Sequence, residues 1–220
     1  MLKGAIFDMD GTLIDSMAMW RGLADRYVRS LGLEPKGEDV RTKNKKRTFQ
    51  CMVEELREYY GIEKSQEQVT AEMQQVIADF YTNEVTVKAG VPAFLQALND
   101  AGVRCCIATA TDRNLAMIAL KRCKLLPYFT TMFCCSEVGA GKNSPEIFRC
   151  ALDYLGTARE ETLVFEDAIY AVRTAKADGF QVAGVYDRFE KEQEELQNLA
   201  DYYLTDYLHP QMLKMLTRGN

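Results

Sequence analysis

Gly4-Ala5-Ile6-Phe7-Asp8-Met9-Asp10-Gly11-Thr12 is the stretch that decides the fold of this chain. Its first half is a continuous apolar run, which is typical of a strand in a parallel sheet that is covered on both faces. Two aspartates separated by one residue end the run, and the glycine after them permits a tight turn. The stretch therefore predicts a buried strand over residues 3–8 that delivers Asp8 and Asp10 to the carboxyl end of a sheet, where open α/β folds bind their ligands.

A helical pattern replaces the strand pattern directly after this stretch. Apolar residues recur at helical spacing in three successive segments, which begin near Ser16, Met52 and Val69. We therefore expect residues 16–85 to form an all-helical domain inserted after the first strand. Residues 1–15 and 86–220 are expected to form the core domain. An insert that leaves the ligand-binding end of a sheet would work as a lid over it.

Strands and helices alternate through the rest of the chain. Short apolar runs predict strands over residues 103–108, 132–135, 162–165 and 181–185, with a last edge strand over 201–204, and amphipathic segments between them predict helices. This alternation is typical of a parallel sheet with right-handed crossovers. The fold class is therefore α/β, with a Rossmann-like core and an inserted helical domain.

Reactive side chains stand at or after the predicted carboxyl ends of the strands. They are Asp8 with Asp10, Thr109, Lys142 before a helix, and Glu166 with Asp167. Carboxylates that share one crevice repel each other unless a cation neutralises them, and oxygen ligands of this kind suit Mg²⁺. A lysine adds a charge for phosphate oxygens. Such a group of residues predicts phosphoryl transfer, in which one carboxylate attacks phosphorus and a second moves protons.

At these residues the chain resembles the haloacid dehalogenase superfamily, on its phosphatase side. The segment Phe7–Ser16 matches the first motif of that family, and Thr109, Lys142 and the pair Glu166-Asp167 match the second, third and fourth motifs in order. The resemblance covers essentially the whole chain. It implies a Rossmann-like core with a helical cap inserted after the first motif, as in β-phosphoglucomutase and phosphoglycolate phosphatase.

The resemblance also implies a role for each matching residue. Asp8 would be the nucleophile and a Mg²⁺ ligand, and Asp10 would be the acid/base and would bind the metal through its backbone carbonyl. Thr109 and Lys142 would hold the transferring phosphoryl group. Asp167 would bind the metal directly, and Glu166 directly or through water. The second aspartate excludes dehalogenase chemistry, and two departures from the family pattern, Asn143 for proline and Ala171 for glycine, remove no reacting group.

Three other functions stay open at this point. A sugar-phosphate mutase of the β-phosphoglucomutase kind usually carries a cap histidine, but Trp20 stands at that position and the single histidine is His209. Phosphonate hydrolysis needs a cap lysine, for which Lys43, Lys45 and Lys46 are candidates. A non-catalytic binding protein on this fold would normally have lost the nucleophile or a metal ligand. The leading interpretation is a phosphatase of a small phosphorylated metabolite.

Composition and charge limit which binding partners and which cellular compartment are expected. A net charge of −5 does not indicate a nucleic-acid partner, and no apolar run approaches the length of a bilayer span. Seven cysteines without a Cys-x-x-Cys pair predict reduced, mostly buried thiols and a cytoplasmic protein. The basic cluster at residues 41–47 is interpreted as a solvated loop, with a nuclear-type signal or an anion-binding surface as alternatives. A monomer is the default expectation.

Overall fold

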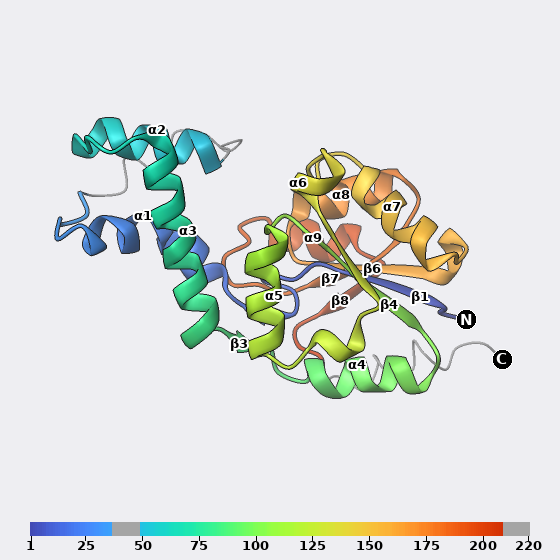
Figure 1. Ribbon diagram of the computed structural model, residues 1–220. Helices are drawn as coiled ribbons and strands as arrows, with labels where there is room; N and C mark the ends of the chain where they lie inside the picture. Colours follow the sequence, from blue (N-terminus) through green and yellow to red (C-terminus); the bar gives the residue numbers. More distant parts are fainter. Residues whose placement is uncertain (37–48, 209–220) are drawn as a thin grey trace. The chain divides into compact units, whose positions relative to one another are not determined.

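The chain forms two compact units in the computed structural model, which describes residues 1–36 and 49–208 (Figure 1). One unit comprises Met1–Met17 together with Val85–Asn220, and the other comprises Ala18–Glu84. The second unit is therefore an insertion into the first, and the chain passes between them twice.

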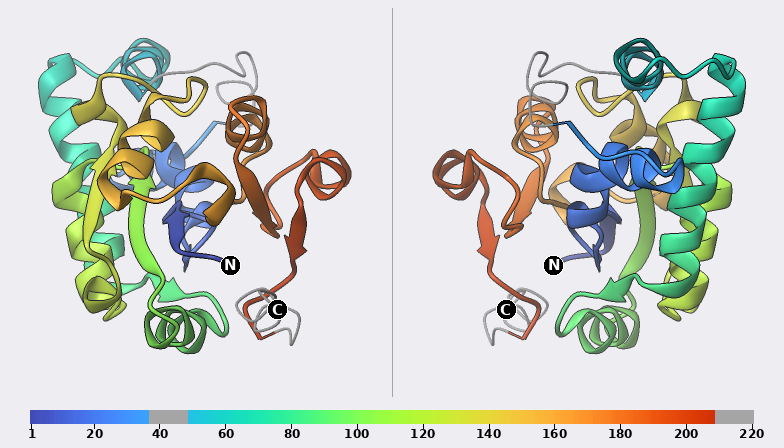
Figure 2. Two further views of the ribbon diagram at one scale, coloured as in Figure 1. Left: turned by 90° about the vertical axis from the view of Figure 1, so that its right-hand side faces the viewer. Right: turned by 90° about the vertical axis from the view of Figure 1, so that its left-hand side faces the viewer.

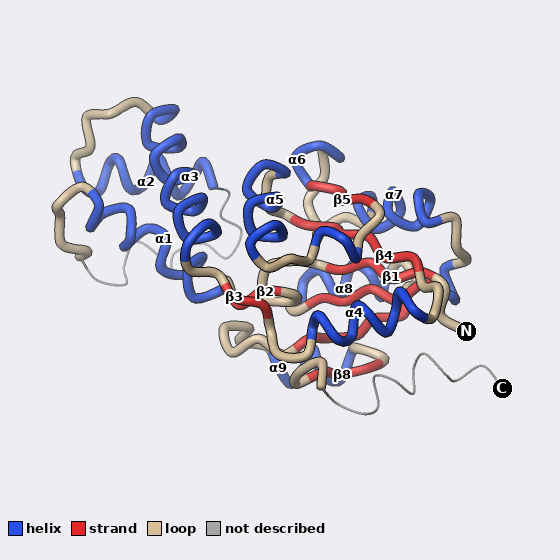
Figure 3. Tube along the Cα trace, turned by 60° about the horizontal axis from the view of Figure 1, so that its bottom comes forward, coloured by secondary structure: helices blue, strands red, loops and turns tan. Residues whose placement is uncertain are grey.

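A six-stranded parallel sheet forms the centre of the first unit (Figure 3). Its order is β5 (Thr131–Cys134), β4 (Arg104–Thr109), β1 (Gly4–Phe7), β6 (Thr162–Glu166), β7 (Gln181–Val185) and β8 (Tyr202–Leu204). The chain builds outward from β1 to β4 and β5, then crosses to β6 on the other side of β1. The ligand-binding crevice of such sheets opens at this change of direction, beyond the carboxyl ends of the strands. The predicted α/β class is confirmed.

Helices connect these strands and cover both faces of the sheet (Figures 1 and 2). They are α4 (Val91–Asp100), α5 (Arg113–Arg122), α6 (Cys135–Val138), α7 (Glu146–Leu155), α8 (Ile169–Ala177) and α9 (Gln193–Leu199), with the 3₁₀ turns η2 (Leu126–Tyr128) and η3 (Arg159–Glu161). The strand predicted over 132–135 is wrong at Cys135, because pairing with β4 ends at Cys134 and Cys135 begins α6. Neither α6 nor α9 was predicted.

The two faces of the sheet bury different kinds of side chain. On one face, α7 and α8 pack over aliphatic residues that include Ile6 and Val164. On the other face, Phe7 and Phe165 stack with their ring centroids 4.2 Å apart, and Phe94 of α4 meets Phe165 edge-on at 5.6 Å. Because Phe7 precedes Asp8 and Phe165 precedes Glu166, this aromatic layer supports the strand ends that carry the acidic residues.

The described residues of the second unit form three helices: α1 (Met17–Ser30), which begins at the last residue of the first unit, α2 (Phe49–Tyr60) and α3 (Gln66–Asn83). Their apolar faces bury Leu23, Leu56 and Met73. A capping box starts α3, because the Ser65 hydroxyl accepts from the Gln68 amide while the Gln68 side chain accepts from the Ser65 amide. The partly buried Trp20 of α1 donates to the Tyr81 hydroxyl of α3 at 3.1 Å, so its indole contacts another helix of this unit.

Two short strands accompany the crossings between the units. β2 (Ile14–Asp15) and β3 (Thr86–Val87) pair antiparallel, with Ile14 opposite Val87. The Lys88 amide extends the ladder by donating to the Leu13 carbonyl at 2.9 Å. The outgoing and returning segments of the chain therefore run side by side. These two strands were not predicted from the sequence, which indicated only helices over 16–85 and no strand at either end of that segment.

The cysteines are more exposed than predicted. Cys105, Cys106 and Cys134 are buried, Cys123, Cys135 and Cys150 are half-buried, and Cys51 is exposed on α2. No disulfide joins any two of the seven. In the described part of the chain, no helix combines the length and the apolar character that a bilayer crossing needs.

Candidate active site

The parallel register brings three carboxylates to one place. Asp8 directly follows β1, Glu166 ends β6, and Asp167 is the next residue. These strands are neighbours, with Phe7 opposite Phe165 and the Asp8 amide donating to the Phe165 carbonyl at 2.9 Å. One carboxylate oxygen of each of the three residues lies within 4.8 Å of the others, and all three side chains are buried. We call Asp8, Glu166 and Asp167 the acidic cluster.

Lys142 supplies the buried positive charge at the acidic cluster. It lies in the turn between α6 and α7, and its side chain is 2% exposed. Its ammonium donates to one oxygen of Asp8 and, at 2.8 Å, to Oε2 of Glu166. Burial lowers the pKa of Lys142, but the charges of Asp8 and Glu166 outweigh that effect and raise the pKa above its ordinary value. Lys142 is therefore charged throughout the physiological range.

One ammonium does not balance three buried carboxylates. Burial raises the pKa of Asp8, and burial raises the pKa of Glu166 to about 8. Burial, followed by the charges of Asp8 and Glu166, raises the pKa of Asp167 well above its usual range. The acidic cluster therefore carries more negative charge than Lys142 neutralises. Three hard oxygen donors with an excess of negative charge fit Mg²⁺, so Asp8, Glu166 and Asp167 are the side chains that could hold this ion.

The carboxylate of Asp10 points to different partners from that of Asp8. Ser16 donates its hydroxyl to Oδ1 of Asp10 at 2.6 Å, and Thr111 donates its hydroxyl to Oδ2 at 2.7 Å. The side chain of Asp10 is not a member of the acidic cluster. Two neutral hydroxyls thus orient the carboxylate of Asp10.

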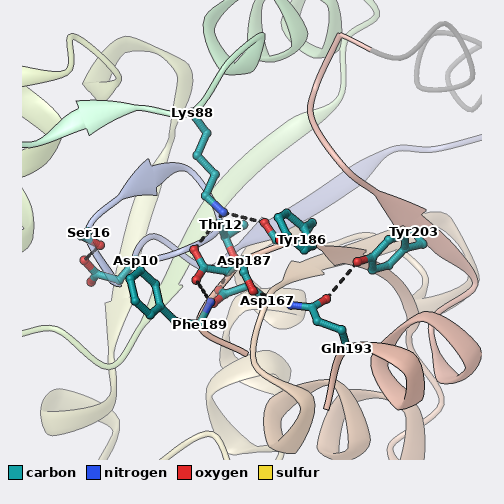
Figure 4. A network of polar contacts seen from close by, with 10 residues as sticks. All are labelled: Asp10, Thr12, Ser16, Lys88, Asp167, Tyr186, Asp187, Phe189, Gln193 and Tyr203. Carbon is teal, nitrogen blue, oxygen red and sulfur yellow. Dashed lines mark hydrogen bonds and ion pairs between the residues drawn. The ribbon is translucent and has the colours of Figure 1, made fainter. Parts of the chain in front are cut away.

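The turn after β1 holds Asp167 in place. Thr12 donates its hydroxyl to Oδ1 of Asp167 at 2.7 Å (Figure 4). Gly11 has φ +84, and a Cβ at this position would meet Oδ2 of Asp167 at 2.3 Å. Glycine is therefore required twice at position 11, by the backbone conformation and by the approach of the carboxylate.

Thr109 lies where the sequence predicts it, at the carboxyl end of β4, and is buried. Its hydroxyl accepts from the Thr111 amide at 3.0 Å. Two charged residues that follow Thr109 in the sequence are paired with other side chains. Arg113 is paired with Glu137 through two contacts of 2.6 Å, and Asp112 precedes α5 and accepts from Ser136 at 2.7 Å.

Sequence reasoning missed several polar residues around the acidic cluster. Thr12 and Thr111 orient Asp167 and Asp10, and only their closeness to the motifs could have indicated them. Ser16, directly before α1, donates its hydroxyl to Asp10. Lys88 and Asp187 form a buried ion pair nearby, for which the sequence has no signal. The basic cluster 41–47, with Lys43, Lys45 and Lys46, and His209 lie outside the described residues.

Comparison with known proteins gives consistent results. The sequence model of the haloacid dehalogenase-like hydrolases matches residues 5–185. The chain is 27% identical over 184 residues to a phosphorylated carbohydrates phosphatase of Thermotoga maritima, covering 82% of this chain and 83% of that protein. It is 29% identical over 185 residues to hexitol phosphatase A of Escherichia coli, covering 83% and 82%. A solved structure of a candidate β-phosphoglucomutase from Thermotoga maritima superposes with a TM-score of 0.82 at 25% identity, over 100% of both chains.

Proposed function

The chain belongs to the haloacid dehalogenase-like hydrolase family, and from this premise we propose that it is a Mg²⁺-dependent phosphatase that works through an aspartyl phosphate on Asp8. The single observation that carries the proposal is the acidic cluster with Lys142 at the carboxyl ends of adjacent strands. The relatives named as phosphatases of phosphorylated carbohydrates and of hexitols point to a small phosphorylated carbohydrate as the substrate class.

In the first step, a carboxylate oxygen of Asp8 attacks phosphorus, and the bond from phosphorus to the ester oxygen breaks. Asp10 gives a proton to the leaving oxygen, so that an alcohol departs. Water then attacks the phosphorus of the aspartyl phosphate while Asp10 takes its proton, and the phosphate leaves with the Asp8 carboxylate restored. Mg²⁺, when bound by the acidic cluster, would neutralise charge on the transferring phosphoryl group.

Lys142 and Thr109 complete the proposed phosphate site. The ammonium of Lys142 already contacts Asp8, so it lies beside the attacking atom and can hold a phosphoryl oxygen. Thr109 stands at the end of the strand next to β1 and offers its hydroxyl and amide. Ser16 and Thr111 keep the carboxylate of Asp10 in a polar, hydrogen-bonded setting, separate from that of the nucleophile.

The unit Ala18–Glu84 is proposed to act as a lid. The paired crossings β2 and β3 join it to the core directly after the motif that carries Asp8 and Asp10. A lid that closes over the site would exclude water and would favour small metabolites over phosphorylated protein chains. Structures with and without a bound phosphate analogue that show no movement of this unit relative to the core would contradict the proposal.

A substrate panel tests the function. Purified protein is incubated with phosphorylated sugars, sugar alcohols and other phosphorylated metabolites, with Mg²⁺ or with chelator, and released phosphate is measured. We expect Mg²⁺-dependent release from a subset of the panel and none from the Asp8→Asn variant. β-Glucose 1-phosphate with a catalytic amount of the bisphosphate is included to detect glucose 6-phosphate, the product of a mutase. Phosphate release that survives both chelation and Asp8→Asn would exclude the proposed mechanism.

A further inference from the structure

A second, largely buried ion pair lies beside Asp167 of the acidic cluster (Figure 4). Lys88, the residue after β3, donates to Oδ2 of Asp187 at 3.2 Å and to the carbonyl oxygen of Tyr186 at 2.7 Å. Only 16% of the Lys88 side chain and 4% of the Asp187 side chain are exposed. The other oxygen of Asp187 accepts from the Phe189 amide at 2.9 Å. Both partners are therefore held in one position by several contacts.

This pair is close to Asp167 because of the sheet order. Asp187 follows β7 and Asp167 follows β6, and these strands are neighbours with Glu166 opposite Gly184. Figure 4 shows Asp167, with its hydrogen bond from Thr12, beside the pair of Lys88 and Asp187. An ammonium thus stands near a carboxylate that the proposed function assigns to the metal.

An ammonium near Asp167 would oppose the binding of a metal ion there. Like charges in a poorly solvated region repel strongly, so an unbalanced Lys88 would weaken the binding of a divalent cation to the acidic cluster. Lys88 nevertheless has a structural role, because its amide closes the ladder between the two crossings and its side chain reaches the end of β7. Asp187 removes this repulsion, because its negative charge neutralises the positive charge of Lys88.

We propose that Asp187 is a positioning residue for the metal site: it neutralises and holds Lys88, so that the ammonium anchors the returning crossing without competing with Mg²⁺ at Asp167. The inference rests on the proposed function only in assigning Mg²⁺ to the acidic cluster. It predicts effects of opposite sign from the two members of one ion pair, which a purely structural ion pair would not give.

The test measures Mg²⁺ binding to the full chain by titration calorimetry, without any substrate. Asp187→Asn leaves the ammonium unbalanced, and the Kd for Mg²⁺ should rise about tenfold, as is typical when a group next to the ligands is removed. Lys88→Met removes the ammonium and leaves a negative charge, so Mg²⁺ should bind more tightly than to the wild type. The double variant is neutral again and should return to within about threefold of the wild type.

Asp201→Asn is the matched control. Asp201 pairs with Lys176 at 2.7 Å and accepts from the Val182 amide near the start of β7, so the variant removes the same charge from a similar pair at the opposite end of that strand. Its Mg²⁺ affinity should equal that of the wild type. Urea unfolding of each variant shows whether it is folded.

The inference is overturned by a folded Asp187→Asn variant that binds Mg²⁺ as tightly as the wild type, or by a Lys88→Met variant that loses affinity as Asp187→Asn does. If Asp187→Asn fails to fold, Lys88→Met must still bind Mg²⁺ more tightly than the wild type, or the inference is wrong. Wild-type protein that binds no Mg²⁺ overturns it as well. Wild-type protein that binds Mg²⁺ but releases no phosphate from the panel contradicts the proposed function alone.

Discussion

Asp8 and Asp10 are separated by one residue, yet their carboxylates meet different groups. Asp8 contacts the ammonium of Lys142 and shares the acidic cluster with Glu166 and Asp167. Asp10 receives hydroxyl donors from Ser16 and Thr111. These different surroundings support the proposed roles, with Asp8 as the nucleophile and Asp10 as the group that moves protons.

Asp10→Asn should therefore slow turnover by roughly 10²–10⁴-fold, because it removes the proton donor and the base but leaves the nucleophile. With a substrate whose leaving group needs no proton, the second step should suffer more than the first. Phosphorylated Asp8 should then accumulate and appear in the intact mass of the acid-quenched protein. Adduct that also forms in the Asp8→Asn/Asp10→Asn double variant would place the phosphate on another residue.

Thr111→Val tests the hydroxyl that orients Asp10. The variant keeps the shape of the side chain and removes one hydrogen bond to a charged group, so kcat should fall roughly tenfold with little change in KM. Thr130→Val is the control, since Thr130 donates to the Cys105 carbonyl at 3.0 Å in the segment that leads into β5. Equal loss of kcat in both variants would show that the effect is general and not specific to Asp10.

At the residue scale, sequence reasoning predicted that the acidic residues of the motifs converge, but it missed the residues that orient them. Asp8, Glu166 and Asp167 stand at strand ends, and strand ends can be read from apolar runs, so their convergence was predictable. Thr111 contacts Asp10 because of its side-chain rotamer, and Lys88 contacts Asp187 because tertiary pairing sets the course of the returning crossing. Neither the rotamer nor the pairing can be read from the sequence. Cys135 shows the same limit, because an apolar run does not reveal that pairing stops one residue earlier.

At the scale of elements, the sheet supports the site through its aromatic face. Phe7 and Phe165 stack directly before Asp8 and Glu166, and Phe94 of α4 closes the layer. The aliphatic face, under α7 and α8, includes Phe180 and Ala108, and Ala108 precedes Thr109, but it carries none of the residues that directly precede the acidic cluster. The positions of the acidic side chains should therefore depend more on the aromatic face than on the aliphatic face.

Phe165→Leu and Phe180→Leu compare the two faces. Both replace a buried ring by a smaller side chain, so each should lower the free energy of unfolding by about 1–3 kcal/mol in urea titrations. Only Phe165→Leu should also weaken Mg²⁺ binding and lower kcat, because the strand end that carries Glu166 loses its packing. Similar metal binding and kcat in the two folded variants would contradict a supporting role for the aromatic face.

At the scale of the whole molecule, stability should depend on pH through the acidic cluster. The ordinary pKa of a glutamate is 4.5, and burial raises that of Glu166 to about 8. Between these values the folded protein binds more protons than the unfolded chain, so metal-free protein should lose stability as the pH rises through this window. Mg²⁺ binds the ionised carboxylates and should reverse the loss.

The difference between the Tm in Mg²⁺ and the Tm in chelator should therefore grow from about pH 5 to about pH 8. Taking this difference removes the contribution of surface groups to the Tm, because they titrate in the same way with Mg²⁺ and with chelator. Glu166→Gln removes one of the shifted groups and should flatten the curve. A difference in Tm that stays constant across the window would mean that the acidic cluster does not bind the ion.

The central place of β1 has a consequence for biosynthesis. Gly4 pairs with Arg104 on one side and with Thr162 on the other, so the strand that leads to Asp8 emerges from the ribosome long before either neighbour. At ordinary elongation rates it waits roughly 5–20 s for β4 and longer for β6. During that interval both of its hydrogen-bonding edges are unsatisfied and its apolar side chains are open to other nascent chains. The helices of Ala18–Glu84, whose contacts are local, can assemble meanwhile. Chaperone binding to the β1 segment of the nascent chain would thus protect the strand that precedes Asp8.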